Sequence, residues 1–191
     1  ATGTTERKLN LESEEAFINK GISFCAICDG GFYKGKDVAV IGGGNSALEE
    51  ALYLARLCNK VYLVHRREGF RAEDSLVDKV KATDNIELVL NSQVAEFSGV
   101  NKLEQIKLNT GKVLKVDGCF EYIGQDANSS LVKEFNVLND EGFIIVNENQ
   151  ETKIKGLYAA GDVCDKKFRQ ITTATSDGTI AALSIASVLK D

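Results

Sequence analysis

The sequence predicts an α/β fold built around a parallel sheet, and three observations support this prediction. Residues 38–41 form a short run rich in β-branched side chains, which three glycines interrupt. Apolar residues then recur at helical spacing over 47–55, and a second apolar run follows at 61–64. This succession of strand, turn, helix and strand is one βαβ unit, whose right-handed crossover makes the strands parallel neighbours. We therefore expect a three-layer, Rossmann-like domain.

The other elements are predicted from local patterns along the chain. Residues 1–20 are polar and indicate a connector, and 71–82 is predicted to be a helix. Short strands bounded by turn residues are predicted at 86–100, 103–111, 112–124, 142–150 and 157–160. The first three of these alternate in hydrophobicity and are expected to be partly antiparallel, as a small β-meander. The apolar stripe of 172–189 predicts a final helix.

Composition and charge exclude several classes of protein. With 43% apolar and 27% charged residues, the chain has enough apolar material for a folded core. A net charge of −5 and the lack of a Lys/Arg run argue against a nucleic-acid partner. No apolar run approaches the roughly 20 residues of a membrane span, and the N-terminus has no signal pattern. We therefore expect no membrane partner and a cytoplasmic location.

A glycine-rich turn separates the first predicted strand from the first predicted helix. Gly42, Gly44 and Ala47 have the spacing of a dinucleotide-binding turn. Glycine permits the tight turn and the close approach of a pyrophosphate, and a small third residue lets the helix pack on the strand. A glycine turn without a ligand is the alternative, but the position between strand and helix favours a nucleotide site.

Basic residues follow the second predicted strand, where the ribose of a bound dinucleotide is expected. An NAD site has an acidic residue about 20 residues after the glycines. This chain has His65, Arg66 and Arg67 there, followed by Arg71. Arginine binds phosphate through two parallel hydrogen bonds, so the cluster suits the 2′-phosphate of NADPH. A solvated basic turn is the alternative interpretation.

Two cysteines three positions apart, Cys25 and Cys28, allow three interpretations. A structural zinc site usually needs four ligands, and the other cysteines are isolated in the sequence: Cys58, Cys119 and Cys164. A structural bridge would close a very small loop and stabilise little. A redox dithiol remains, and we expect no metal. Asp29 is a candidate acid for a leaving thiolate, or a turn residue before two glycines. The isolated cysteines are expected to pack in the core.

Four motifs together resemble the bacterial-type, low-molecular-weight thioredoxin reductase. They are CAICDG at 25–30, GGGNSALEEALYL at 42–54, HRREGFRAE at 65–73 and AAGDVCDKKFRQ at 159–170. Their order and spacing match that family over nearly the whole chain. A nicotinamide site together with a dithiol also needs a two-electron carrier between them, and flavin is the usual one.

The resemblance implies a role for each motif. Cys25 and Cys28 are the redox-active disulfide, in which Cys28 meets FAD, Cys25 exchanges with thioredoxin and Asp29 is the acid. The residues implied to bind NADPH are Gly42, Gly43, Gly44, Asn45, Ser46, Ala47, His65, Arg66, Arg67 and Arg71. Those implied to contact FAD are Gly161, Asp162, Arg169, Gln170 and Ile171, and the cofactor set is completed by Ile123 and Gly124.

The resemblance also implies that two domains are interleaved along the chain. Residues 1–8 are the end of an FAD-domain segment, 9–134 are an NADPH-binding domain with the cysteine pair, and 135–191 are the C-terminal part of an FAD-binding domain. We expect this chain to be a piece of the reductase that lacks the family's first FAD-binding stretch. Glu121 departs from the family, in which its position is usually apolar.

The expected function is therefore that of an NADPH-dependent flavoprotein disulfide reductase. Electrons pass from NADPH through FAD to the cysteine pair, and on to thioredoxin or a similar dithiol protein. The resemblance implies a homodimer for the full-length family. Two alternatives stay open: an isolated NADPH-binding fragment without flavin or turnover, and the flavin reductase subunit of a peroxidase system.

Overall fold

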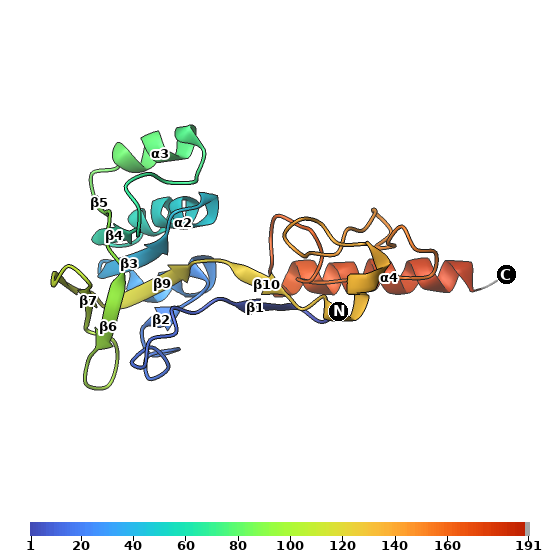
Figure 1. Cartoon of the computed structure of the whole chain (residues 1–191), viewed down its shortest axis with the longest axis horizontal. Coiled ribbons are helices and arrows are strands. Elements are labelled where there is room, and N and C mark those ends of the chain that lie inside the picture. The colour runs from blue at the N-terminus through green and yellow to red at the C-terminus, as the bar shows by residue number, and fades with distance from the viewer. Residues whose placement is uncertain (190–191) are drawn as a thin grey trace. The chain divides into compact units, whose positions relative to one another are not determined.

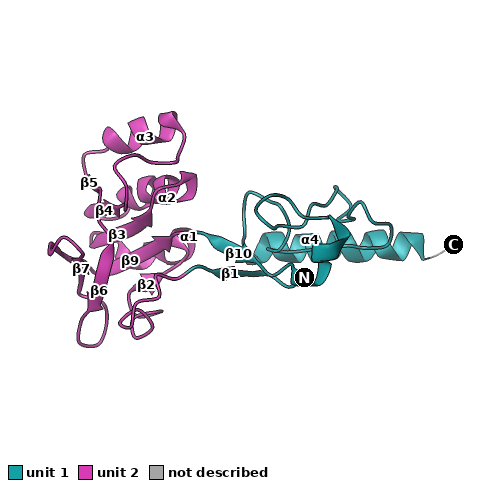
Figure 2. Ribbon diagram, viewed as in Figure 1, with its two compact units in different colours: residues 1–7, 124–191 teal, residues 8–123 magenta. Residues whose placement is uncertain are grey.

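The computed structural model describes residues 1–189, which form two compact units. Unit 1 consists of Ala1–Arg7 and Gly124–Asp191, and unit 2 is the continuous stretch Lys8–Ile123 (Figure 2). The chain therefore passes between the units twice. Lys190 and Asp191, at the end of the predicted segment 135–191, lie outside the described residues.

Unit 2 is built on a five-stranded parallel sheet (Figure 1). Its strands lie in the order β2 (Ile22–Ser23), β9 (Gly118–Tyr122), β3 (Asp37–Gly42), β4 (Lys60–Val64) and β5 (Ile86–Val89). β3 and β4 are parallel neighbours, with Val38 opposite Val61, as the βαβ pattern predicts. Five of the six residues of β3 are buried, because it lies inside the sheet with both faces covered.

One layer of structure covers each face of the parallel sheet. Helices α2 (Asn45–Ala55) and α3 (Asp74–Lys81) share one core with the sheet, which includes Val38, Val40, Leu48, Leu54 and Val80. A small antiparallel sheet covers the other face and consists of β6 (Val94–Ser98), β7 (Gln105–Leu108) and β8 (Val113–Lys115). It forms a second core with the parallel sheet, which includes Ala39, Ile41, Phe97, Ile106 and Leu114. Residues of β3 alternate between the two cores because successive side chains of a strand point to opposite faces. The predicted three-layer α/β class with an antiparallel meander is confirmed.

Three predicted elements of unit 2 differ in the structure. The segment 86–100 was predicted as one strand, but it divides into β5 of the parallel sheet and β6 of the antiparallel sheet. The segment 112–124 was predicted as one strand, but it divides into β8 and β9, which belong to different sheets. The division is fixed by the Val116 N–H, which donates to Glu104, and the Asp117 N–H, which donates to Asp37. The helix predicted at 71–82 begins only at Asp74.

Unit 1 contains one short ribbon and one long helix. β1 (Thr4–Glu6) pairs antiparallel with β10 (Gln125–Ala127), a 3₁₀ segment η2 (Ser130–Phe135) follows, and α4 (Ile171–Val188) ends the unit. The pairing of β10 with β1 places the change of unit at Ile123, before the predicted boundary at residue 134. The assignment of the two units to NADPH and FAD stays a prediction.

The strands predicted at 142–150 and 157–160 are wrong for this chain. Within the part of the chain that the structure describes, these segments form only isolated bridges: Ile144 with Leu138 and with Cys164, and Tyr158 with Glu151. The apolar residues there instead form a small core with Val137, Val163 and Cys164. The final helix is confirmed as α4. No helix among residues 1–189 combines the length and apolar character that crossing a membrane requires.

Candidate redox and nucleotide sites

Cys25 and Cys28 form a disulfide at the start of a short helix, α1 (Ala26–Asp29). The S–S distance is 2.04 Å and the Cα atoms lie 5.3 Å apart. Cys25 is the N-cap of α1, and its Sγ accepts a hydrogen bond from the Cys28 N–H at 3.2 Å. Cys25 is half-buried and Cys28 is exposed. The pair therefore lies where a reactant can reach it.

Two hydroxyl groups hold the loop that carries the disulfide. Ser23 Oγ donates to Asp29 Oδ2 at 2.6 Å and accepts from the Cys25 N–H at 3.1 Å. The Tyr122 hydroxyl accepts from the Ala26 N–H at 2.7 Å. Sequence reasoning missed both residues. Tyr122 could not be found from local pattern, because residues 26 and 122 meet only through the pairing of β2 with β9. A serine two positions before Cys25 is a turn signal that could have been noticed.

Replacing Tyr122 with Phe is expected to lower the free energy of unfolding by about 1–3 kcal/mol, because the buried Ala26 N–H loses its acceptor. Urea denaturation at pH 7 measures the change. Tyr33→Phe is the matched control: the Tyr33 ring packs edge-on against Phe120, and its hydroxyl has no hydrogen-bond partner among the described residues. Equal losses in the two variants would contradict the assignment.

The glycine turn after β3 is closely packed at two positions and open at the third. A Cβ on Gly42 would lie 2.5 Å from the Tyr122 carbonyl oxygen, and one on Gly43 would lie 2.1 Å from the His65 ring. A Cβ on Gly44 would meet nothing within 4 Å. Gly44 is the N-cap of α2, and no described side chain caps that helix. The backbone N–H groups at the start of α2 are thus available to an anion such as a phosphate.

The basic loop after β4 is hydrogen-bonded to the glycine turn. The Arg71 N–H donates to the Gly43 carbonyl at 2.8 Å, and Asn45 Oδ1 accepts from the Glu73 N–H at 2.9 Å. These bonds also explain why α3 begins after Glu73. The structure therefore brings the predicted arginines to the predicted turn. The side chains of Arg66, Arg67 and Arg71 are exposed, and none of them forms an ion pair within residues 1–189.

His65 is a different kind of group from the cationic donor that the sequence suggests. Its side chain is 6% exposed and stacks on Phe70, with ring centroids 5.4 Å apart. Burial lowers the pKa of His65, and the charges of the three neighbouring arginines lower it further. The ring is therefore neutral at pH 7, and the positive charge of this loop comes from the arginines. His65 Nε2 is buried without a partner among the described residues, so it remains available to a polar ligand atom.

The residues expected to contact FAD gather in unit 1, before and at the start of α4. Gly161 has a φ of 82°, and its N–H donates to Asp177 Oδ2 at 3.0 Å. Arg169 Nε donates to the Asp162 carbonyl at 3.1 Å, and the guanidinium lies 4.1 Å from the Phe143 ring centroid. Asp162 Oδ1 is buried and has no partner among residues 1–189. An unpaired buried carboxylate oxygen fits a hydroxyl donor of a cofactor.

Two of the expected flavin contacts lie at the start of α4 itself. Gln170 is its N-cap and forms a capping box with Thr173, and Ile171 is 85% exposed. Ile123 and Gly124 lie together at the second crossing between the units.

The remaining cysteines have the properties of packing residues. Cys58, Cys119 and Cys164 are free and buried. Burial raises the pKa of the Cys58 and Cys164 thiols to about 11 and raises that of Cys119 well above its ordinary value. These thiols therefore stay protonated at neutral pH and are poor nucleophiles. Among the described residues, no group of three or more His, Cys, Asp and Glu side chains could hold a metal ion.

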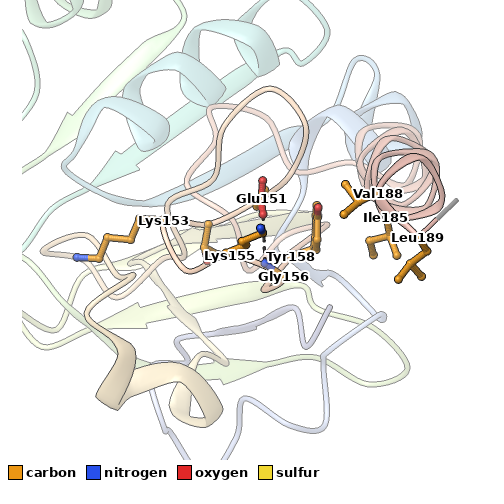
Figure 3. A pocket seen from close by; sticks show the side chains of 9 residues that line it. Glu151, Lys153, Lys155, Gly156, Tyr158, Ile185, Val188 and Leu189 are labelled. Carbon is orange, nitrogen blue, oxygen red and sulfur yellow. Dashed lines mark hydrogen bonds between the residues drawn. The ribbon is translucent and has the colours of Figure 1, made fainter. Parts of the chain in front are cut away.

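Unit 1 also contains a pocket of about 510 Å³. The end of α4 supplies its apolar wall through Ile185, Val188 and Leu189, and the segment around Glu151 supplies the polar side (Figure 3). Glu151 accepts a hydrogen bond from the Gly156 N–H at 3.2 Å within this wall. None of the predicted site residues lines the pocket.

A disulfide and a glycine turn of dinucleotide-binding spacing within one Rossmann-like unit are features of the class of nicotinamide-dependent disulfide oxidoreductases. Residues 1–178 match the family described as pyridine nucleotide-disulphide oxidoreductase, and the chain belongs to this family.

Within this family, the chain is similar to thioredoxin reductases. It is 47% identical over 191 residues to the thioredoxin reductase of Mycoplasma genitalium, covering 97% of this chain and 61% of the relative. The crystal structure of thioredoxin reductase from Streptococcus pyogenes superposes with a TM-score of 0.92 at 38% identity, covering 98% of this chain and 63% of that one. A relative from Pseudomonas fluorescens, 46% identical over 196 residues, is named glucosaminate ammonia-lyase; 96% of this chain and 61% of that protein are covered. The chain thus spans about three fifths of the length of these relatives.

Proposed function

We propose that this chain is part of a thioredoxin reductase that moves electrons from NADPH through FAD to Cys25–Cys28 and on to thioredoxin. The observation that carries the proposal is the reachable disulfide, held in the same unit as a glycine turn with three free arginines. Tyr122 touches both parts, since its hydroxyl contacts the disulfide loop and its backbone lies beside Gly42 in the β3–β9 register.

Each group of residues has a defined task in this proposal. The N-terminus of α2 and Arg66, Arg67 and Arg71 bind the phosphates of NADPH. Gly161, Asp162 and Arg169 bind FAD, which when bound supplies the two-electron relay between nicotinamide and disulfide. Cys25 exchanges with the partner's disulfide, and Asp29 exchanges a proton with Cys28. Ile27 lies between the two cysteines and Phe32 follows them; these apolar side chains are 51% and 74% exposed, which suits a protein partner.

The absorbance spectrum of the purified chain, followed by NADPH addition under nitrogen, tests this proposal. A yellow protein that bleaches with NADPH supports the reductase. Asp162→Asn should then weaken FAD binding, whereas Asp165→Asn, at a nearby exposed position, should leave it unchanged. A colourless chain that still binds NADPH would support the alternative of a nucleotide-binding fragment without flavin or turnover.

The identity of the electron acceptor is tested separately. Oxidised thioredoxin and the disulfide of a peroxidase system are offered to the reduced Cys25–Cys28 pair, and thiol formation in each acceptor is followed. Faster transfer to thioredoxin supports the proposal, and faster transfer to the peroxidase component favours the reductase subunit of a peroxidase system. A homodimeric state of the full-length protein and a cytoplasmic location stay predictions.

A further inference from the structure

We propose that Ser23 is a positioning residue of the redox site, whose hydroxyl holds Asp29 in the orientation from which it gives a proton to Cys28. The proposal rests on the acid role of Asp29 in the proposed function. Ser23 itself touches neither sulfur in this assignment, and it acts through the carboxyl group.

The contacts of Ser23 carry the inference. Its side chain is 7% exposed at the end of β2, where it pairs with Phe120 of β9. The hydroxyl proton lies between Ser23 Oγ and Asp29 Oδ2, which are 2.6 Å apart, whereas the alternative acceptor, the Cys25 carbonyl, is 3.5 Å away. The lone pairs of Oγ face the Cys25 N–H at 3.1 Å. One buried hydroxyl therefore joins the backbone of the first cysteine to the carboxyl group that follows the second.

The backbone of Asp29 is fixed independently of this bond. The Asp29 N–H donates to the carbonyl of Cys25, the N-cap of α1, at 3.0 Å. The remaining freedom of the residue is rotation of its side chain, and the Ser23 hydroxyl is the group that restricts this rotation.

The chemical step that this arrangement serves is opening of the disulfide by an external thiolate. Dithiothreitol thiolate attacks Cys25 Sγ, the Cys25–Cys28 bond breaks, and the electron pair passes to Cys28 Sγ. The acid form of Asp29 gives its proton to that sulfur, which leaves a Cys28 thiol and an Asp29 carboxylate. The second thiol of dithiothreitol loses its proton to water and attacks the dithiothreitol sulfur of the mixed disulfide. Cys25 leaves as a thiolate, and dithiothreitol departs as its cyclic disulfide.

Reduction of the complete chain by dithiothreitol, quenched with acid and measured by alkylation and mass, tests the proposal between pH 4.5 and 8. Asp29→Asn is expected to slow the reaction roughly 100-fold, within the range of general acid catalysis. Ser23→Ala is expected to slow it about 5–10-fold in the native background and less than about 2-fold when combined with Asp29→Asn. Ser92→Ala, at another buried serine of unit 2, is the control with no expected change.

Each outcome has a defined meaning. An equal effect of Ser23→Ala with and without Asp29 would show that Ser23 acts only on local structure, and no effect in either background would overturn the proposal outright. If Asp29→Asn has no effect on the rate, Asp29 is not the acid, and the positioning role of Ser23 fails with it; the rest of the proposed function would still stand. If Ser23→Ala does not fold, Ser23→Thr and Ser23→Val replace it, because threonine has a hydroxyl where valine has a methyl group. The Thr variant should then be reduced faster than the Val variant.

Discussion

Replacing Arg66 and Arg67 with alanine is expected to weaken binding of NADPH by roughly 100-fold and to leave NADH binding within about 2-fold of its original value. Hydrogen bonds to a charged group each contribute about 1.5–3 kcal/mol, and the exposure of both side chains places the expected loss at or below the lower end of the sum for two contacts. Both side chains are exposed and lie on the loop that is hydrogen-bonded to the Gly43 carbonyl. Only NADPH has the 2′-phosphate that these guanidinium groups would bind.

Titration of the chain with each nucleotide, followed by nicotinamide fluorescence, measures this difference. The combined variant Arg56→Ala and Lys79→Ala removes the same charge from exposed positions on the end of α2 and on α3, so it controls for the net field of unit 2. If the Arg66/Arg67 variant still prefers NADPH strongly over NADH, the 2′-phosphate assignment is wrong. Equal losses in both double variants would point to long-range charge rather than to a phosphate site.

The stability of unit 2 is expected to fall as pH rises from about 4.5 to 8, because a buried carboxyl group keeps its proton over this range. Glu14 and Glu121 are each 2% exposed. Burial, and next the neighbouring Glu14, raise the pKa of Glu121 to about 8, although the Leu9 N–H and Lys8 act in the opposite direction. Cys119 also faces this pair, from the same strand as Glu121.

The direction follows from proton counting. Between the two pKa values, the unfolded chain has released the Glu121 proton and the folded chain retains it. Raising the pH therefore favours unfolding, by up to about 1.4 kcal/mol for each pH unit from this group. Above pH 8 the folded state ionises as well, and this dependence ends. Stability linked to Glu121 is thus fully present at acidic pH and lost on the alkaline side.

Glu121→Gln is expected to flatten this dependence, because an amide keeps the shape of the acid without titrating. Urea denaturation between pH 5 and 8.5 measures it, with Glu104→Gln, an exposed carboxylate of unit 2, as the control. The Gln variant should be more stable than the native chain at pH 8 and similar at pH 5. Parallel curves for the native and Glu121→Gln proteins would show that Glu121 does not hold its proton.

Most of unit 2 could be predicted from the sequence because its pattern is local. The β3–α2–β4 unit needs only a β-branched run, three glycines and a helical repeat, all within residues 38–64. The strands predicted in unit 1 failed because an apolar run becomes a strand only when another strand pairs with it. Around Ile144 and Tyr158, the described residues supply single bridges instead of ladders.

The candidate sites show the same limit of local reasoning. Cys25, Cys28 and Asp29 could be named from their spacing, and the arginines could be named from their distance along the chain to the glycines. The contact between Tyr122 and Ala26 spans 96 residues and depends on strand order, which no local pattern gives. The neutral state of His65 was also hidden, because it follows from burial against Gly43 and Phe70.

The β1–β10 ribbon has a consequence for protein engineering. Glu6 lies opposite Gln125, and the Arg7 N–H donates to the Gly124 carbonyl at 3.0 Å, so the chain leaves unit 1 and returns to it at neighbouring points. Residues 8–123 are therefore a cassette whose two ends are held together by its host. Because its two ends lie side by side, we expect the segment 8–123 to be accepted as an insertion in a tight hairpin of a host protein, in which Cys25–Cys28 would respond to the redox conditions.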